Sequence, residues 1–589
     1  MILEPTSRRA SVHNNGIPMR ILPLVLAVLM ASCAPSPKED QKFESLAGNY
    51  IGSLLRMNPE WATQLGDHRY DGKLSDYSAA GVAASRALAV AYLDSVQSIE
   101  LGKLNAANRI DCRILRTNLE YTLFQTDSLR EYEWNPMNYN PGGAIYPLLA
   151  RDFAPLDERL ESVRERLIGI PRVLDAARMT LKTPPKIYTE TALQQNAGTI
   201  GLIRDDINVY VAQSTWTAEK KNAMKAAQDS AVRSLQSFGE WMEKDLLPRS
   251  TADFRLGNDL YIRKLGYALE SDISKEEIMK RAETDLRQTQ EALYATALPL
   301  YRGFFPKGDT AQKRTVIRKV LDELAGRHPD NENIVGRARE DLQKATEFVR
   351  SQNLVTVPSD PVKVIVMPEY QRGVAVAYCD AAGPLEKNGQ TFYSISPTPK
   401  DWTKERTVSF FREYNDYMLQ NLTIHEAMPG HYLQLAHSNQ FKAPTMVRAI
   451  FSSGTFVEGW ATYAEQLMAE KGYGGPEVRM QQLKMRLRLI INAMLDQKIH
   501  TQGMTEKEAM DLMKNEGYQE EGEAAGKWRR ACLSSTQLST YYVGNIGIND
   551  LRTAYEKKFG PSTGLKTMHD ALLSFGSPAP RYLMDALGL

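Results

Sequence analysis

The sequence predicts a large, mainly α-helical protein with one small β-sheet. Its 589 residues are 43% hydrophobic and 24% charged, the composition of a globular protein with two or three domain-sized lobes. Hydrophobic side chains recur at helical spacing from Lys42 to about Arg350, and again after Asp401. Between these two parts, short β-branched and aromatic runs alternate with turn-forming residues, which predicts a few strands.

The first 32 residues have the layout of a secretory signal peptide. An apolar run of ten residues, Ile21 to Met30, ends in small residues before Cys33, and is too short to span a bilayer as a helix. This arrangement resembles the signal of bacterial lipoproteins. We therefore expect removal of residues 1–32, lipidation of Cys33, and export to a bacterial membrane, with Ala34 favouring the outer membrane. The alternative is a plain signal peptide with an incidental cysteine, and a periplasmic protein.

Charge and cysteine content exclude two other classes of protein. The formal net charge is +1, from 72 basic and 71 acidic residues, so we expect no nucleic-acid partner. Beyond Cys33, the three remaining cysteines lie far apart and without zinc-knuckle spacing: Cys112, Cys379 and Cys532. They predict buried thiols and no disulfide framework.

Residues 33–353 predict an N-terminal helical lobe. Three long helices are expected, at Leu156 to Lys182, at Ala218 to Leu247 before Pro248, and at Ser274 to Leu298. The last of these opens with Ser274 and Glu277 in capping-box spacing. No fixed-period repeat is evident, which argues against a solenoid.

Residues 354–589 predict a second lobe, in which a small sheet precedes a helical part. A sheet of three or four strands is expected from the runs 355–357, 362–367, 374–378 and 391–396. Helix resumes after Asp401, which is a suitable N-cap residue.

The helical part contains two histidines and a glutamate within seven residues: His425, Glu426 and His431. The pattern begins like HExxH, in which two histidines one turn apart bind zinc and the glutamate activates water. Here the second histidine comes six residues later, which is roughly 240° out of phase on a regular helix. Pro429 and Gly430 are residues that interrupt a helix, and a two-residue bulge would return His431 to the position of the second ligand.

An alternative interpretation treats the same residues as structural. Thr423 and Glu426 have capping-box spacing, so Glu426 could close a helix N-terminus while the two histidines are satisfied polar side chains. The metal interpretation needs a third ligand, for which Glu458 in the segment 457–467 is the candidate. Glu465 lies two turns further on nearly the same face, where it could orient a ligand histidine through its other nitrogen. Both glutamates could instead lie on a solvated helix face.

The stretches HEAMPGHYLQ (425–434) and VEGWATYAE (457–465) resemble a bacterial family known as domain of unknown function 885. Further similar stretches are 58–71, 366–368, 391–397 and 538–551. The family resembles the gluzincin group of zinc metallopeptidases, which implies a zincin-like fold with a deep cleft between helical lobes.

The resemblance also implies roles for individual residues. His425, His431 and Glu458 would bind zinc, and Glu426 would be the general base. Tyr541 would stabilise the reaction intermediate, with Tyr542 as the adjacent alternative and aromatic core packing as the structural explanation of either residue.

These observations together predict a zinc-dependent metallopeptidase that cleaves oligopeptides. An extended peptide is expected along an edge strand at 391–396. Arg529 and Arg530 are candidates to receive a substrate carboxylate, or else form a solvated basic pair. The alternatives are a zinc hydrolase of a non-peptide amide or ester, and a lipid-anchored binding or assembly protein with a degenerate metal site.

Overall fold

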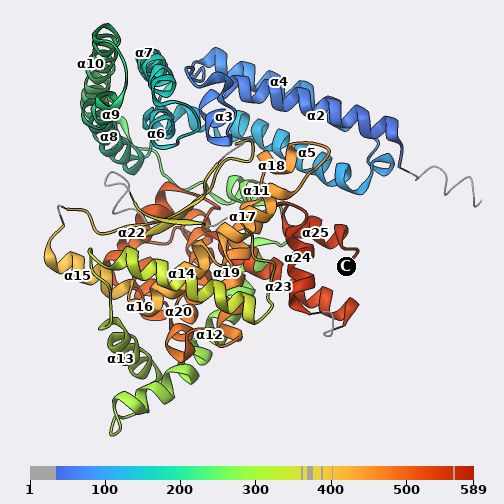
Figure 1. Cartoon of the computed structure of the whole chain (residues 1–589), viewed down its shortest axis with the longest axis vertical. Coiled ribbons are helices and arrows are strands. Elements are labelled where there is room, and N and C mark those ends of the chain that lie inside the picture. Colours follow the sequence, from blue (N-terminus) through green and yellow to red (C-terminus); the bar gives the residue numbers. More distant parts are fainter. Residues whose placement is uncertain (1–34, 360–361, 368–375, 387–388, 401, 561–563) are drawn as a thin grey trace, which may run out of the picture.

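The computed structural model describes residues 35–359, 362–367, 376–386, 389–400, 402–560 and 564–589. Helices account for most of this part of the chain, and three short strands form one sheet. Helices α2 to α10 form one layer in Figure 1, and the later helices gather below it. The predicted signal peptide and Cys33 lie outside the described residues, as does the N-cap expected at Asp401.

The first group of helices packs side by side (Figure 1). Its members are α2 (Pro37–Met57), α3 (Pro59–Leu65), α4 (Ala79–Gln97) and α5 (Ala106–Phe124). Their buried side chains, including Phe43 and Leu115, share a core with Val447 and Tyr582 from the C-terminal part. This shared core attaches the N-terminal helices to the rest of the molecule.

A second group has a hydrophobic core of its own. It consists of α6 (Gly142–Ala150), α7 (Leu156–Thr180), α8 (Lys186–Gly201), α9 (Ile207–Gln213) and α10 (Ala218–Trp241). Apolar side chains at helical spacing on α7, namely Leu160, Val163, Leu167 and Ile170, face Leu235 of α10 in this core. The helices predicted at 156–182 and 218–247 are therefore present, although the second continues from Met242 to Leu246 as a π-helical turn.

The third group precedes the sheet but packs on helices that follow it. It comprises α11 (Asn258–Leu269), α12 (Lys275–Phe304), α13 (Lys313–Ala325) and α14 (Ile334–Ser351). Ser274 caps α12 as expected, its hydroxyl accepting the backbone N–H of Glu277. The helix runs past the predicted end at Leu298 because Pro299 is accommodated within it. Helices α12 and α14 pack on α20 and α16, so the domain boundary at 353/354 stays a prediction.

The sheet contains β1 (Lys363–Val366), β2 (Ala377–Asp380) and β3 (Phe392–Ile395), in the order β1-β3-β2. Strand β1 pairs with β3 in parallel, and β2 pairs with β3 antiparallel. Because β3 is central, both of its edges are paired, and the peptide-binding edge expected at 391–396 is wrong. Strand β2 also begins later than predicted, and residues 374 and 375 lie outside the described residues.

The strand predicted at 355–357 is also wrong. The backbone of Thr356 bonds to side chains of two helices rather than to a strand: its N–H donates to Asp570 at 2.8 Å, and its carbonyl accepts from His437 at 2.7 Å. Burial accounts for the two valines of this run, since Val355 is 3% exposed and Val357 packs against the same core, whereas Thr356 is exposed.

The loop after β2 is docked on the N-terminal helices. The backbone N–H of Leu385 donates to the carbonyl of Leu65 at 2.8 Å, and Glu386 pairs with His68 at 2.9 Å. Arg151 forms an ion pair with Asp380 at the end of β2. These contacts fix the position of β2, which adjoins the site described below.

The remaining helices follow the sheet, and most of them share the largest core with α14 and the strands. They are α15 (Lys404–Glu413), α16 (Asp416–Glu426), α17 (His431–Gln440), α18 (Val447–Ile450), α19 (Gly454–Glu470), α20 (Gly475–Gln502), α21 (Glu506–Asp511), α22 (Glu521–Leu533), α23 (Ser539–Phe559), α24 (Leu565–Leu573) and α25 (Pro580–Ala586). Helix α15 is capped by Thr403, whose hydroxyl accepts the N–H of Arg406. Among the described residues, no helix is long and apolar enough to cross a membrane.

Candidate metal centre

The break between α16 and α17 brings the two histidines together. Helix α16 ends at Glu426 and α17 begins at His431. Within the break, the N–H of Gly430 donates to the carbonyl of Ile424 at 2.9 Å. A Cβ on Gly430 would lie 1.9 Å from the carbonyl oxygen of His425, so only glycine fits this close approach. The imidazole rings of His425 and His431 consequently lie edge to face, with centroids 4.7 Å apart.

The capping-box alternative for Glu426 does not hold. Helix α16 begins at Asp416, and its cap is Asn415, whose side-chain oxygen accepts the N–H groups of Tyr417 and Met418. Thr423 lies inside the helix, and Glu426 is its last residue. Glu426 is therefore not closing a helix N-terminus.

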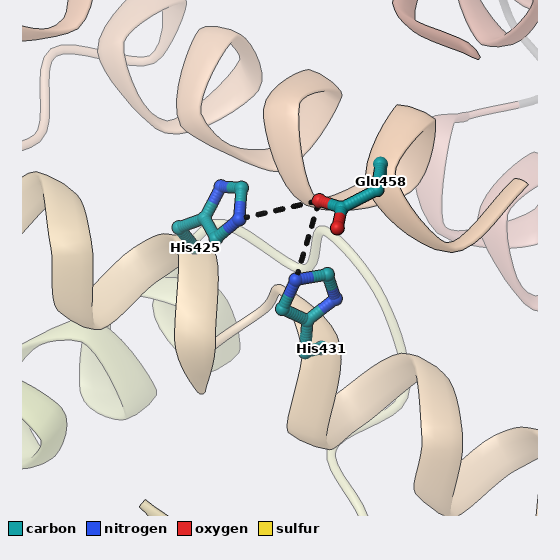
Figure 2. Close-up of side chains that lie close together, drawn as sticks. All are labelled: His425, His431 and Glu458. Carbon is teal, nitrogen blue, oxygen red and sulfur yellow. Dashed lines mark ion pairs between the residues drawn. The ribbon is translucent and has the colours of Figure 1, made fainter. Parts of the chain in front are cut away.

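Three side chains from three helices converge on one point (Figure 2). The Nε2 atoms of His425 and His431 each lie 3.6 Å from Oε2 of Glu458 on α19. One donor atom of each residue lies within 4.8 Å of the other two. The 3.6 Å separations are longer than hydrogen bonds, which leaves room for an ion between the three atoms.

The donor set fits a catalytic zinc site. Oε2 of Glu458 is buried and accepts no hydrogen bond within the described part of the chain. Such an atom is costly to bury, and a cation between Glu458 and the two histidines would satisfy it. Two imidazoles and one carboxylate are a known ligand set for catalytic zinc, which leaves one position open for water or substrate.

Helix α19 is positioned by a contact that only glycine permits. Gly459 of α19 crosses Gly544 of α23 so closely that a Cβ on Gly459 would lie 2.5 Å from the Gly544 backbone. The next residue, Trp460, donates its indole N–H to the carbonyl of Pro429 at 2.8 Å. The helix that carries Glu458 is therefore tied both to α23 and to the break that carries His431.

A second layer of side chains orients His425. Nδ1 of His425 lies 2.7 Å from Oε1 of Glu465, and the amide of Asn421 donates to Oε2 of Glu465 at 2.6 Å. An ionised carboxylate only accepts, so Nδ1 carries a hydrogen, and Nε2 is the ring nitrogen that faces Glu458. Glu465 thus lies where the sequence predicted it, whereas Asn421 was missed. Its position one turn before His425 on the same helix was the available signal.

Glu426 lies beside the three converging side chains, in contact with the sheet. The backbone N–H of Cys379 on β2 donates to Oε2 of Glu426 at 2.9 Å. Burial raises the pKa of Glu426 to about 7, although the nearby charge of His425 acts in the opposite direction. A carboxyl with such a pKa can both accept and return a proton near neutral pH.

The two histidines differ in their protonation. Burial lowers the pKa of His431 to about 4. Burial also opposes protonation of His425, but the carboxylates of Glu458 and Glu465 outweigh it and raise the pKa of His425 well above its usual value. A metal ion would therefore displace the proton from Nε2 of His425 on binding. A neutral His431 is suited to donate a lone pair to a metal.

The two candidate tyrosines have different hydrogen-bond partners. Tyr542 is 1% exposed and donates its hydroxyl to Asp285 at 3.0 Å, which commits it to the core. The Tyr541 oxygen instead accepts from Arg530 at 3.1 Å. Burial acts to raise the carboxyl pKa of Glu458, but the two histidines outweigh it and hold that pKa low, and the positive charge of Arg530 acts in the same direction as the histidines. Of the two tyrosines, Tyr541 is thus the one whose hydrogen-bond partner acts electrostatically on the candidate metal centre.

The two neighbouring arginines also differ. Arg529 donates to Thr191 at 2.9 Å and to Gln194 at 3.1 Å, both on α8. Arg530 points to Tyr541 and to Gln537, at 2.9 Å. Of the pair proposed from the sequence, only Arg530 is connected to the candidate site.

The fold and the site define a mainly helical protein with a buried His-His-Glu cluster at a helix break. The model of the family described as "Bacterial protein of unknown function (DUF885)" matches residues 59–587. The chain therefore belongs to this family. A search of curated proteins found no match.

Two solved structures share the fold. A "putative lipoprotein of unknown function" from Shewanella oneidensis is 33% identical, with a TM-score of 0.81, over 93% of this chain and 100% of that chain. A "putative lipoprotein" from Colwellia psychrerythraea is 18% identical, with a TM-score of 0.77, over 93% of this chain and 98% of that chain.

Proposed function

We propose that the protein is a zinc-dependent hydrolase, and specifically a metallopeptidase that cleaves oligopeptides. One observation carries the proposal: the buried Oε2 of Glu458 and the Nε2 atoms of His425 and His431 face one another, with Glu426 beside them. Nitrogen and carboxylate donors in this number suit zinc. The relationship to gluzincin peptidases and the deep cleft remain parts of this proposal.

The chain's own residues would divide the chemistry between them. A bound zinc ion would supply Lewis-acid activation of water and of a substrate carbonyl. Glu426, held at Oε2 by the Cys379 N–H, would take a proton from the attacking water at Oε1 and return it to the leaving amine. Tyr541 would donate its hydroxyl hydrogen to the oxyanion, because Arg530 occupies a lone pair of the Tyr541 oxygen and leaves that hydrogen available.

The outer edge of β2 is the proposed binding site for an extended peptide. Its inner edge pairs with β3, and the N–H of Cys379 on the outer edge reaches Glu426. Because Glu426 occupies the Cys379 N–H, a peptide that continues the sheet would pair with the other outward backbone groups of β2, and it would lie beside the proposed general base.

The proposed location is outside the cytoplasm, with a lipid anchor at Cys33. The proposal rests on the apolar run from Ile21 to Met30, and on the description of both structural relatives as lipoproteins. Lipid labelling of the full chain should be lost in Cys33→Ser, and labelling that persists would contradict the anchor.

Glu426→Gln tests the proposed function. The purified chain with added zinc is screened against peptides with free and blocked ends. Loss of the general base should lower kcat by roughly 10²- to 10⁴-fold while zinc content is unchanged. Glu405→Gln, on the exposed face of α15, is the matched control. Full activity of Glu426→Gln would contradict its role, and zinc binding without turnover of any peptide would contradict the peptidase.

A further inference from the structure

Helix α22 lies between α8 of the N-terminal part and α20 of the C-terminal part. Arg529 bonds it to α8, and Glu523 forms an ion pair with Arg488 of α20. The helix is thus held on two sides. Its last turn carries Arg530, whose guanidinium donates to Tyr541 and whose charge acts on Glu458 of the candidate metal centre.

Three basic side chains gather between α20 and α22: Arg488, Lys527 and Arg530. Only Arg488 has an acidic partner within the described residues, namely Glu523. Lys527 is 6% exposed, yet in the same part of the chain it makes neither a hydrogen bond nor an ion pair. Burial, together with the charges of Arg488 and Arg530, holds the pKa of Lys527 well below its usual value.

Arg530 lacks a counter-charge of its own. Its hydrogen bonds go to the neutral oxygens of Gln537 and Tyr541, and no carboxylate pairs with it in the described part of the chain. Arginine normally binds a carboxylate through two parallel N–H groups, and a single Nη2 makes both of these bonds. The rest of the donor fork of Arg530 is therefore available to an incoming anion.

Helix α23 connects this group of basic side chains to the candidate metal centre. Arg530 contacts Tyr541, which lies one turn before Gly544 on α23, and Gly544 crosses Gly459 beside Glu458. An anion on Arg530 would lie on the α22 side of the three candidate ligands. A carboxylate is the anion that an oligopeptide carries, at its C-terminus or on an acidic side chain.

We propose that Arg530 and Lys527 form a subsite that binds a carboxylate group of the substrate beside the candidate metal centre. The subsite deepens the proposed hydrolase function and rests on it. It restricts the substrates to peptides that place a free carboxylate near the scissile bond. A carboxylate there would favour protonation of Lys527, so binding is accompanied by proton uptake from solvent.

Calorimetric titration of the purified full chain, with and without added zinc, tests the subsite. The probes are N-acetyl-phenylalanine and its C-terminal amide, and N-acetyl-glutamate amide and N-acetyl-glutamine amide. Each carboxylate probe has a neutral counterpart of the same shape. Arg530→Gln should weaken binding of a carboxylate probe by about tenfold or more. Arg529→Gln, whose partners lie on α8, is the matched control and should bind as the native chain does.

The probes also identify the source of the carboxylate. Preference for N-acetyl-phenylalanine over its amide assigns a C-terminal carboxylate, and preference for the glutamate probe assigns an acidic side chain. Titration in buffers of different ionisation enthalpy should show proton uptake in the native chain and none in Lys527→Met.

Two results would overturn the subsite. One is binding of a carboxylate probe that Arg530→Gln leaves unchanged, and the other is no saturable binding of either carboxylate probe up to about 10 mM. Metal content is measured separately. If the chain holds no zinc but binds a carboxylate probe in a way that depends on Arg530, the proposed carboxylate subsite stands and the proposed zinc hydrolase function is contradicted.

Discussion

Single hydrogen bonds set the proton positions of individual histidines. Glu465 holds a hydrogen of His425 at Nδ1, which turns Nε2 of His425 towards the candidate metal centre. Hydrogen bonds also set the proton position of His569, which lies in the hydrophobic core. Its Nδ1 donates to the carbonyl of Leu354 at 2.7 Å, and its Nε2 accepts the hydroxyl of Tyr463 at 2.9 Å. Both nitrogens are satisfied only while the ring is neutral.

The pH dependence of stability should contain a contribution from His569. Burial lowers its pKa to about 4, although the Leu354 carbonyl acts in the opposite direction. In the unfolded chain it would titrate near 6.5, so the unfolded state takes up the proton first as pH falls. Stability from His569 is fully present above pH 6.5. It is lost as pH falls towards 4, by about 3 kcal/mol at most.

The test of this prediction compares the melting temperatures of the native chain and of His569→Gln, whose side chain does not titrate, at pH 7 and at pH 4.5. The native chain should melt at the higher temperature at pH 7, and the difference should shrink by pH 4.5. A difference in melting temperature that is the same at both pH values would contradict this assignment.

At the scale of helices and strands, the crossing of α19 and α23 determines where Glu458 lies. The two backbones meet at Gly459 and Gly544, and a side chain at either position would push the helices apart. Trp460 then connects α19 to the Pro429 carbonyl in the break between α16 and α17. The geometry of the candidate metal centre therefore depends on helix packing as much as on the ligands.

Gly459→Ala should lower stability by about 1–3 kcal/mol, because its Cβ overlaps the Gly544 backbone. It should also weaken zinc binding, since Glu458 moves with the helix. The control is Gly454→Ala on the same helix, where the added Cβ would meet Thr540 at an ordinary 4.0 Å. Melting temperature and zinc affinity are measured for both variants. If Gly459→Ala and Gly454→Ala have the same melting temperature and the same zinc affinity, the crossing of α19 and α23 does not position Glu458.

At the scale of the whole molecule, local sequence patterns predicted the helices. They could not predict which segments distant in sequence pack or pair with each other. Helical periodicity and the Ser274 cap depend on neighbouring residues, so the class of fold and the start of α12 are confirmed. Strand order depends on partners distant in sequence, which is why β3 was taken for an edge and is central. The packing of α12 on α20 across the expected boundary has the same origin.

In the candidate site, too, residues that are close in sequence could be predicted, whereas contacts between distant segments could not. His425, Glu426 and His431 are close in sequence, and Pro429 and Gly430 indicated the helix break that brings them together. Contacts from other elements carried no comparable signal: the Cys379 N–H on Glu426 comes from β2, and the Trp460 indole on Pro429 comes from α19.

Zinc content of the purified chain tests the central claim most directly. The native chain, and His437→Ala as a control whose imidazole bonds to the Thr356 carbonyl away from the cluster, should each hold about one zinc per chain. His425→Ala, His431→Ala and Glu458→Gln should lose it while keeping the helical content of the native chain. Zinc that persists in all three variants, or a native chain that binds none, would contradict the account.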